Sequence, residues 1–130
     1  LMTHMIQPTI PANRVLMVYD YPKSQAALAR VRQGEVPVAE RFEVYLGPIE
    51  LANGYRELND PEEQRERFAR DLSRRQKQNA VQPPMDERLL ASLPAMPDCS
   101  GVALGVDRLL TAMLGSDRLP DALAFPFDRA

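Results

Sequence analysis

The sequence of 130 residues contains one cysteine and one histidine, and this scarcity excludes several kinds of site. A single thiol, Cys99, cannot form a disulfide within the chain or a zinc site built from several cysteines. The only histidine, His4, lies near the opposite end of the sequence, so no Cys–His nucleophile pair is predicted. We therefore expect Cys99 to be a small buried residue without a catalytic role.

Long apolar runs and a strong charge imbalance are also absent. No stretch approaches the roughly 20 apolar residues that cross a bilayer, and no charged-then-apolar secretory signal opens the sequence, which predicts a cytoplasmic protein. Lys and Arg number 16 and Asp and Glu number 18, so the formal charge is -2. A net charge of this sign provides no overall electrostatic attraction for nucleic acid, so no tRNA-binding surface is predicted. With 45% hydrophobic residues, the chain can bury one modest core.

Two segments that alternate apolar and polar residues, 40–46 and 49–57, flank a Gly-Pro pair and predict an antiparallel hairpin. With an even number of loop residues, Glu43 and Glu50 project from the same face. Cross-strand neighbours lie about 5 Å apart and diagonal ones roughly 7 to 8 Å, so the two carboxylates repel unless a cation lies between them. A magnesium ion that also holds nucleotide phosphates would relieve this repulsion. The alternative for each glutamate is a solvated strand residue.

The second strand of the hairpin continues into an amide, an aromatic ring and a third carboxylate: Asn53, Tyr55 and Glu57. Together these groups suit a cationic amino-acid side chain and its amine. Strict alternation places them on the face opposite Glu50, so a site shared with the magnesium pair requires a bend or bulge, for which Gly54 is the natural position. The alternative is a polar turn that leaves the hairpin.

Near the C-terminal end, residues 101–110 form a short apolar run with two glycines that leads into a helix and delivers Arg108 to the helix start. Helix N-termini favour anions, and a planar guanidinium there suits phosphate oxygens. In the alternative interpretation, Arg108 forms a surface salt bridge with Asp107 or Asp128.

The remaining elements are predicted from local patterns. Residues 1–14 are expected to be irregular and 15–19 to form a strand. Asp60, Pro61 and Glu63 have the spacing of a helix start, which predicts a helix to about Lys77. Its basic side chains are expected to form a mostly solvated face: Arg65, Arg67, Arg70, Arg74, Arg75 and Lys77.

Two further helices are predicted. A short one near residues 86–93 is expected to bury Leu89, Leu90 and Leu93. A third, over residues 106–114 and ended by Gly115, carries apolar residues at helical spacing that predict a core-facing stripe. The stripe comprises Val106, Leu109, Leu110, Met113 and Leu114.

The glycine-containing junction before Arg108 resembles motif 3 of the class II aminoacyl-tRNA synthetases. Together, ERFEVYLGPIELANGYRELND, PDCSGVALGVDRLL and LAFPFDRA are similar to the lysine branch of that class, and most of all to the elongation factor P lysine ligases, the PoxA or GenX group. This resemblance implies an α+β fold, with part of the class II antiparallel sheet flanked by helices. It also implies formation of a lysyl-adenylate from ATP, with preference for a β-lysine, and transfer of the acyl group to a lysine of elongation factor P.

The resemblance implies roles for individual residues. Arg108 would be the catalytic contact to the ATP phosphates, and Glu43 and Glu50 would hold Mg²⁺ and, through it, ATP. The lysine pocket would comprise Asn53, Tyr55, Glu57 and Ala103. Lysyl-tRNA synthetases typically carry glycine at the position of Ala103. A methyl group there removes space at the pocket floor and disfavours α-lysine relative to β-lysine, since overpacking of this size typically costs about 1 to 3 kcal/mol. The alternative is that Ala103 is an ordinary small strand residue.

Nothing in the sequence resembles synthetase motifs 1 and 2. The resemblance therefore implies that residues 1–130 are the C-terminal portion of a catalytic domain that is inactive by itself. It implies that the full-length protein is a homodimer that acts on lysine or β-lysine and on elongation factor P. Two alternatives remain: a fragment of a lysyl-tRNA synthetase catalytic core, and a noncatalytic module that binds lysine or nucleotide.

Overall fold

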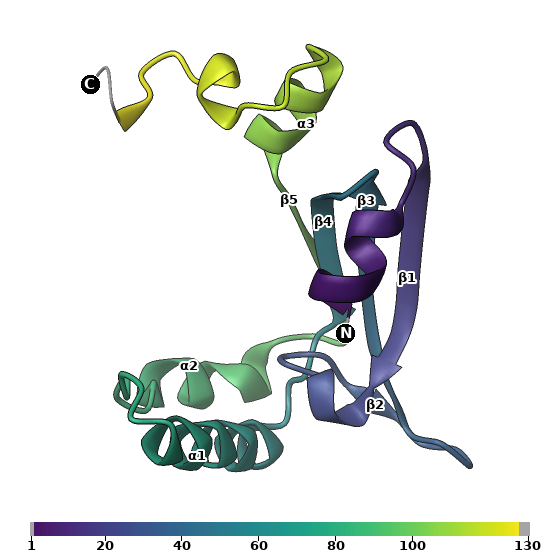
Figure 1. Cartoon of the computed structure of the whole chain (residues 1–130). Coiled ribbons are helices and arrows are strands. Elements are labelled where there is room, and N and C mark those ends of the chain that lie inside the picture. The colour runs from purple at the N-terminus through teal and green to yellow at the C-terminus, as the bar shows by residue number, and fades with distance from the viewer. Residues whose placement is uncertain (1, 128–130) are drawn as a thin grey trace. The chain divides into compact units, whose positions relative to one another are not determined.

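The computed structural model describes residues 2–127, which form a sheet and several helices (Figure 1). Four strands are hydrogen-bonded in the order β1-β3-β4-β5, and a two-residue strand, β2, pairs antiparallel with β3 with Val31 opposite Ala39. The predicted α+β class is confirmed. The strands are β1 (Val15–Pro22), β2 (Val31–Arg32), β3 (Val38–Leu46), β4 (Ile49–Arg56) and β5 (Ser100–Leu104).

The chain forms two compact units. The first unit comprises Leu1–Tyr21, Arg41–Gly54 and Val102–Ala130, of which residues 2–21, 41–54 and 102–127 are described. The second unit comprises Pro22–Glu40 and Tyr55–Gly101.

In the first unit, β3 and β4 form the predicted hairpin around the tight turn at Gly47 and Pro48. Gly47 has a left-handed backbone with φ of 54°, and a Cβ atom there would lie 2.7 Å from the Cα atom of Ala12. Only glycine fits both conditions without strain. The N–H of Gly47 donates to the carbonyl of Arg14 at 2.9 Å, which ties the preceding segment to the turn.

The prediction that residues 1–14 are irregular is wrong for part of this segment. The chain forms a helical turn of π type, η1 (Met2–Ile6), and a 3-10 turn, η2 (Gln7–Thr9). The Nε2 group of Gln7 donates to the carbonyl of Pro48 at 2.6 Å. This bond to the hairpin turn is a long-range contact, and local sequence does not reveal it.

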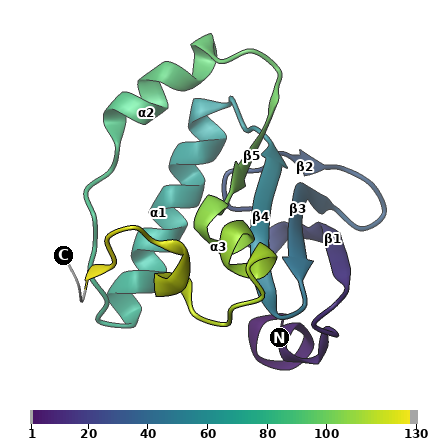
Figure 2. The ribbon, with the colours of Figure 1, turned by 90° about the horizontal axis from the view of Figure 1, so that it is seen from above.

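Helix α3 (Val106–Met113) follows the first unit's part of β5, and Gly115, with φ of 66°, ends it as predicted. The short turn η5 (Leu119–Ala122) packs beside α3 (Figures 1 and 2). The predicted core-facing stripe is wrong. Among the described residues Val106, Leu110, Met113 and Leu114 are exposed, Met113 by 75%, and Leu109 is half-buried. Helical periodicity identifies an apolar face, but burial requires a partner surface that the pattern does not specify.

In the second unit, helix α1 spans Pro61–Lys77, as predicted. The Asp60 carboxylate accepts hydrogen bonds from the backbone N–H groups of Glu62 and Glu63 at 2.9 and 3.1 Å. These bonds satisfy two of the amides that a helix start leaves unpaired, so the helix begins at this point.

Helix α2 (Glu87–Ser92) contacts α1 and continues into the 3-10 turn η4 (Leu93–Ala95) (Figures 1 and 2). Leu90 and Leu93 are buried as predicted, whereas the prediction for Leu89 is wrong because its side chain is 37% exposed. Positions three apart share a helix face, and an adjacent position lies about 100° away from it. A helix of six residues buries one narrow stripe, and Leu89 lies outside it.

The solvated basic face predicted for α1 is wrong at Arg67, which is only 9% exposed. Its guanidinium Nη1 donates to the carbonyls of Ala27 and Ala29 at 2.9 and 2.7 Å, and its Nε and Nη2 atoms donate to Glu63 at 3.2 and 2.5 Å. A buried guanidinium is tolerated because these acceptors replace water. Arg67 therefore connects α1 to the segment before β2.

We predict that Arg67→Ala lowers the free energy of unfolding by about 2 to 3 kcal/mol, because the carbonyl of the buried Ala29 loses its donor and that of Ala27 loses a part-buried one. Urea denaturation followed by circular dichroism measures the change. Arg74→Ala is the matched control on the same helix, since Arg74 is exposed and pairs with a neighbouring carboxylate, Asp71. We expect it to change stability by less than about 0.5 kcal/mol. Equal effects of the two substitutions would contradict the structural role of Arg67.

Candidate functional site

The carboxylate of Glu43 is the centre of a buried polar cluster in the first unit. Glu43 is only 7% exposed. Its Oε2 atom accepts hydrogen bonds from the hydroxyls of Tyr21, at 2.5 Å, and Tyr45, and its Oε1 atom pairs with Nη2 of Arg41. The Arg41 guanidinium also lies over the Tyr21 ring, 4.7 Å from its centroid. These four residues, Tyr21, Arg41, Glu43 and Tyr45, are called the Glu43 cluster below.

The cluster fixes the charge state of its members at neutral pH. Although burial opposes ionisation of Glu43, hydrogen bonds from Tyr21 and Tyr45 and the positive charge of Arg41 hold its pKa below the usual range. Burial, with the adjacent Glu43 carboxylate, raises the pKa of Tyr45 to about 12 and raises that of Tyr21 as well. Glu43 is therefore an anion and both tyrosines are neutral donors.

Glu43 and Glu50, the pair predicted to hold Mg²⁺, lie on the two strands of the hairpin. The negative charge of Glu50 contributes to the raised pKa of Tyr45, so Glu50 acts electrostatically on the Glu43 cluster. A carboxylate oxygen accepts about two hydrogen bonds. The Oε2 atom of Glu43 accepts two, whereas Oε1 accepts one, from Arg41, so any further contact of this carboxylate would be made through Oε1.

The two predicted ligands are both carboxylates. Among residues 2–127, no group of three or more histidine, cysteine, aspartate or glutamate side chains is arranged to hold a metal ion. Mg²⁺ takes one or two carboxylates and completes its shell with water and substrate phosphates. The assignment of Glu43 and Glu50 to this ion stays a prediction.

Arg108 lies in the first turn of α3, directly after the junction at Gly105, as predicted. Its side chain is exposed, and Nη1 donates to the backbone carbonyl of Glu50 at 2.9 Å. The N–H of Gly105 donates to the carbonyl of Leu51 at 2.8 Å, which attaches the start of the helix to β4. The structure thus brings Arg108 to the main chain of the predicted magnesium ligand. Of the two carboxylates considered for a salt bridge, Asp128 lies outside the described residues.

The four residues predicted to line a lysine pocket are divided between the units. Asn53, on β4, and Ala103, on β5, belong to the first unit, where Asn53 is half-buried and Ala103 exposed. Tyr55 and Glu57 belong to the second unit, and both are half-buried. Their predicted role in binding lysine stays a prediction. Cys99, expected to be buried, is half-buried and free.

Sequence reasoning missed the partners of Glu43. Arg41, Glu43 and Tyr45 occupy alternate positions on one strand, and alternate residues of a strand point to the same face. This spacing was sufficient to place Arg41 and Tyr45 beside Glu43. The same spacing could not predict the contact of Tyr21 with Glu43, because Tyr21 lies on β1 and the predicted strand ended at residue 19.

A cleft of about 600 Å³ in the second unit involves none of the predicted site residues. It lies between the segment around η3 (Lys23–Gln25) and α1, and most of its charged lining groups are paired along the helix. The residues that line it include Lys23, Ser24, Gln33, Glu66, Arg70 and Arg74.

Comparison with known proteins identifies the class of this chain. Residues 5–129 match the family model of the class II tRNA synthetases (D, K and N), so the chain belongs to this family. No helix in the part of the chain that the structure describes has the length and apolar character to span a membrane.

Within the family, the chain is similar to proteins named elongation factor P–(R)-β-lysine ligase. The protein from Proteus mirabilis is 50% identical over 126 residues, which are 96% of this chain and 39% of the relative. Those from Pectobacterium atrosepticum and Salmonella arizonae are 48% and 50% identical over 131 residues, 100% of this chain and 40% of each relative. The resemblance inferred from the sequence is confirmed, and the chain spans about two fifths of the length of these relatives.

We predict that the stability contributed by the Glu43 cluster is greatest near neutral pH. The folded-state pKa of Glu43 is lowered, so its contribution is present above the unfolded value of about 4.5 and is lost as pH falls through the folded pKa. The folded-state pKa of Tyr45 is raised to about 12, so its contribution is present below the unfolded value of 10 and is lost as pH rises through 12.

Urea denaturation of the wild type and of Glu43→Gln over the acid and alkaline ranges measures this contribution. At pH 7 we expect the variant to be less stable by roughly 2 kcal/mol, because it lacks the charged acceptor, with the difference shrinking toward either end. Glu66→Gln, which alters an exposed carboxylate of α1, is the control at pH 7. A difference between wild type and Glu43→Gln that is constant from pH 3 to pH 11 would contradict the prediction.

Proposed function

We propose that this chain is the C-terminal portion of the catalytic domain of an ATP-dependent ligase that attaches a lysine, preferentially β-lysine, to elongation factor P. The observation that carries this proposal is the identity of 48% to 50%, over nearly the whole chain, to relatives named for that activity. The position of Arg108 beside the main chain of Glu50 supports it, because the two groups assigned to the nucleotide phosphates are then neighbours.

The proposed reaction has two steps. The carboxylate oxygen of lysine attacks the α-phosphorus of ATP, which forms the lysyl-adenylate and releases pyrophosphate. The neutral amine of the acceptor lysine then attacks the acyl carbon and an amide bond forms. AMP leaves with the electrons of the broken bond between the acyl carbon and its phosphate oxygen, and the amine nitrogen loses one proton to solvent. Negative charge develops on phosphate oxygens in the first step, so fixed positive charge is the main requirement.

Arg108 supplies such a charge. A guanidinium carries five N–H donors, and the bond from Nη1 to the Glu50 carbonyl uses one of them. That bond orients the planar group, and the exposed remainder is available to phosphate oxygens. Glu43 and Glu50 would hold Mg²⁺, which when bound neutralises phosphate charge.

The lysine substrate would be held by Asn53, Tyr55 and Glu57, with the carboxylate of Glu57 available to a substrate ammonium group. The methyl group of Ala103, in place of the glycine of lysyl-tRNA synthetases, would narrow the pocket and favour the displaced amine of β-lysine. This residue distinguishes the ligase from the second candidate function, a lysyl-tRNA synthetase core.

The test is lysine-dependent exchange of pyrophosphate into ATP, with α-lysine and (R)-β-lysine, followed by transfer of labelled lysine to elongation factor P. Both this chain and the longest chain that its gene encodes are assayed. Because the chain spans two fifths of its relatives, we expect turnover that depends on elongation factor P from the longer chain only, with (R)-β-lysine preferred. Transfer to tRNA instead would favour the synthetase, and binding of lysine without exchange would favour the noncatalytic module.

We predict that Arg108→Ala, made in the form of the protein that is active, lowers kcat/KM for pyrophosphate exchange by about 100-fold, because a positioned charge for the phosphates is removed. Arg108→Lys should recover only part of the loss, since an ammonium group cannot bind two oxygens in a plane. The control is Arg118→Ala, which removes an exposed arginine after α3. Activity of Arg108→Ala within about twofold of wild type would refute the role of Arg108.

A further inference from the structure

The main chain of Glu57 is held on both sides within the second unit. Its N–H donates to the carbonyl of Cys99 at 3.0 Å, and its carbonyl accepts a hydrogen bond from Nε of Arg30 at 2.9 Å. Ala29 lies opposite Glu57 in an antiparallel bridge. The backbone of Glu57 therefore cannot move without breaking at least one of these bonds.

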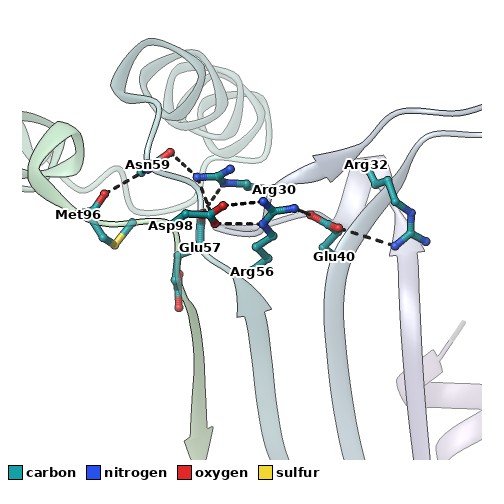
Figure 3. A network of polar contacts seen from close by, with 8 residues as sticks. All are labelled: Arg30, Arg32, Glu40, Arg56, Glu57, Asn59, Met96 and Asp98. Atoms are coloured by element: carbon teal, nitrogen blue, oxygen red, sulfur yellow. Dashed lines mark hydrogen bonds and ion pairs between the residues drawn. The ribbon is translucent and has the colours of Figure 1, made fainter.

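Arg30 connects Glu57 to two neighbouring segments (Figure 3). Its Nη2 atom donates to Oδ1 of Asn59 at 2.7 Å and lies 3.6 Å from Oδ1 of Asp98. Asn59 in turn donates from Nδ2 to the carbonyl of Met96 at 3.1 Å. One half-buried guanidinium thus links the end of β4 to the loop before α1 and to the segment before β5.

Arg56 holds Asp98 from the other side, as Figure 3 shows. Its Nε and Nη2 atoms donate to the two carboxylate oxygens of Asp98 at 3.1 and 2.7 Å. Paired hydrogen bonds of this kind fix a carboxylate in orientation as well as in position. The carboxylate of Asp98 is therefore a negative charge of fixed position beside Arg30. Asp98 directly precedes Cys99, whose carbonyl accepts the hydrogen bond from the N–H of Glu57.

Gly101, on β5, provides the space that the Glu57 carboxylate occupies. A Cβ atom at Gly101 would lie 2.4 Å from Oε1 of Glu57, a distance at which one of the two groups must move. Gly101 is not among the residues with positive φ, so the backbone itself accepts other residues there. Because Oε1 is the end of a flexible side chain, an added methyl group would displace the carboxylate and leave the strand in place.

We propose that Arg30 and Gly101 are positioning residues for Glu57: Arg30 fixes its main chain and Gly101 leaves the place for its carboxylate. Together they set how tightly the site binds the ammonium group of an amino-acid substrate. This inference rests on the proposed function, in which Glu57 lines the lysine pocket. A charged hydrogen bond depends steeply on the position of the acceptor, so displacement of the carboxylate by about 1 Å weakens binding.

The first measurement requires no ligand. Amide hydrogen exchange of Glu57, followed by nuclear magnetic resonance, is compared in the wild type, Arg30→Ala and Arg32→Ala. Arg32 lies at the outer end of the same network, 3.8 Å from Glu40, and is the matched control. We expect exchange at Glu57 to accelerate at least tenfold in Arg30→Ala only, because a bond that limits opening is lost. Unchanged exchange in Arg30→Ala would overturn the role of Arg30.

The second measurement is the affinity for α-lysine, (R)-β-lysine and ATP, determined by calorimetric titration of the same variants and of Gly101→Ala. We expect Arg30→Ala and Gly101→Ala to lower lysine affinity about tenfold and ATP affinity by less than about twofold. Gly101→Ala should leave exchange at Glu57 unchanged. Equal loss of lysine and ATP affinity, or unchanged lysine affinity in Gly101→Ala, would overturn the inference.

The two measurements separate this inference from the proposed function. If the wild-type longer chain binds neither lysine isomer, the lysine pocket of the proposed function is refuted and with it the effect on substrate affinity, whereas exchange at Glu57 still decides the role of Arg30. If Arg30→Ala does not fold, Arg30→Lys replaces it. Lysine keeps the charge beside Asp98 but lacks the Nε donor of the planar guanidinium that bonds Glu57, so we expect the same acceleration.

Discussion

The tight turn at Gly47 is the constraint on which the candidate phosphate site depends. A left-handed backbone and a close approach to Ala12 leave room only for glycine, and this turn sets β3 beside β4. Glu43 and Glu50 therefore lie on neighbouring strands of one hairpin. The same strand, β4, supplies the carbonyls that receive Arg108 and the start of α3. The conformation of Gly47 thereby helps to position Glu50 and Arg108, which lie far apart in sequence.

Within residues 2–127 each unit buries one charged side chain, and polar partners compensate the charge of each. Glu43 is surrounded by Arg41 and two tyrosine hydroxyls, and Arg67 by two backbone carbonyls and Glu63. A buried charge that loses its partner is costly, so such groups specify a unique arrangement of the elements that surround them. The cluster around Glu43 also keeps the carboxylate ionised, which is the state that a metal ligand requires.

Local signals in the sequence were reliable where the physics is local. The capping residue Asp60 and Pro61 predicted the start of α1, and Gly115 predicted the end of α3. Burial was less predictable: the stripe on α3 is exposed in the described chain, and Arg67 is buried although it is charged. The helical period reveals which residues share a face, but not whether another element covers that face.

The sequence by itself determined the hairpin, the three helices and the class II resemblance, because turn residues, caps and motif spacing act over a few positions. Tertiary structure alone decided that Tyr21 joins Arg41 and Tyr45 at Glu43, and that Arg30 and Gly101 flank Glu57. These contacts join residues 22 to 44 positions apart in sequence, or depend on the absence of a Cβ atom at one point. Chain folding brings such groups together, and no local pattern encodes their distance.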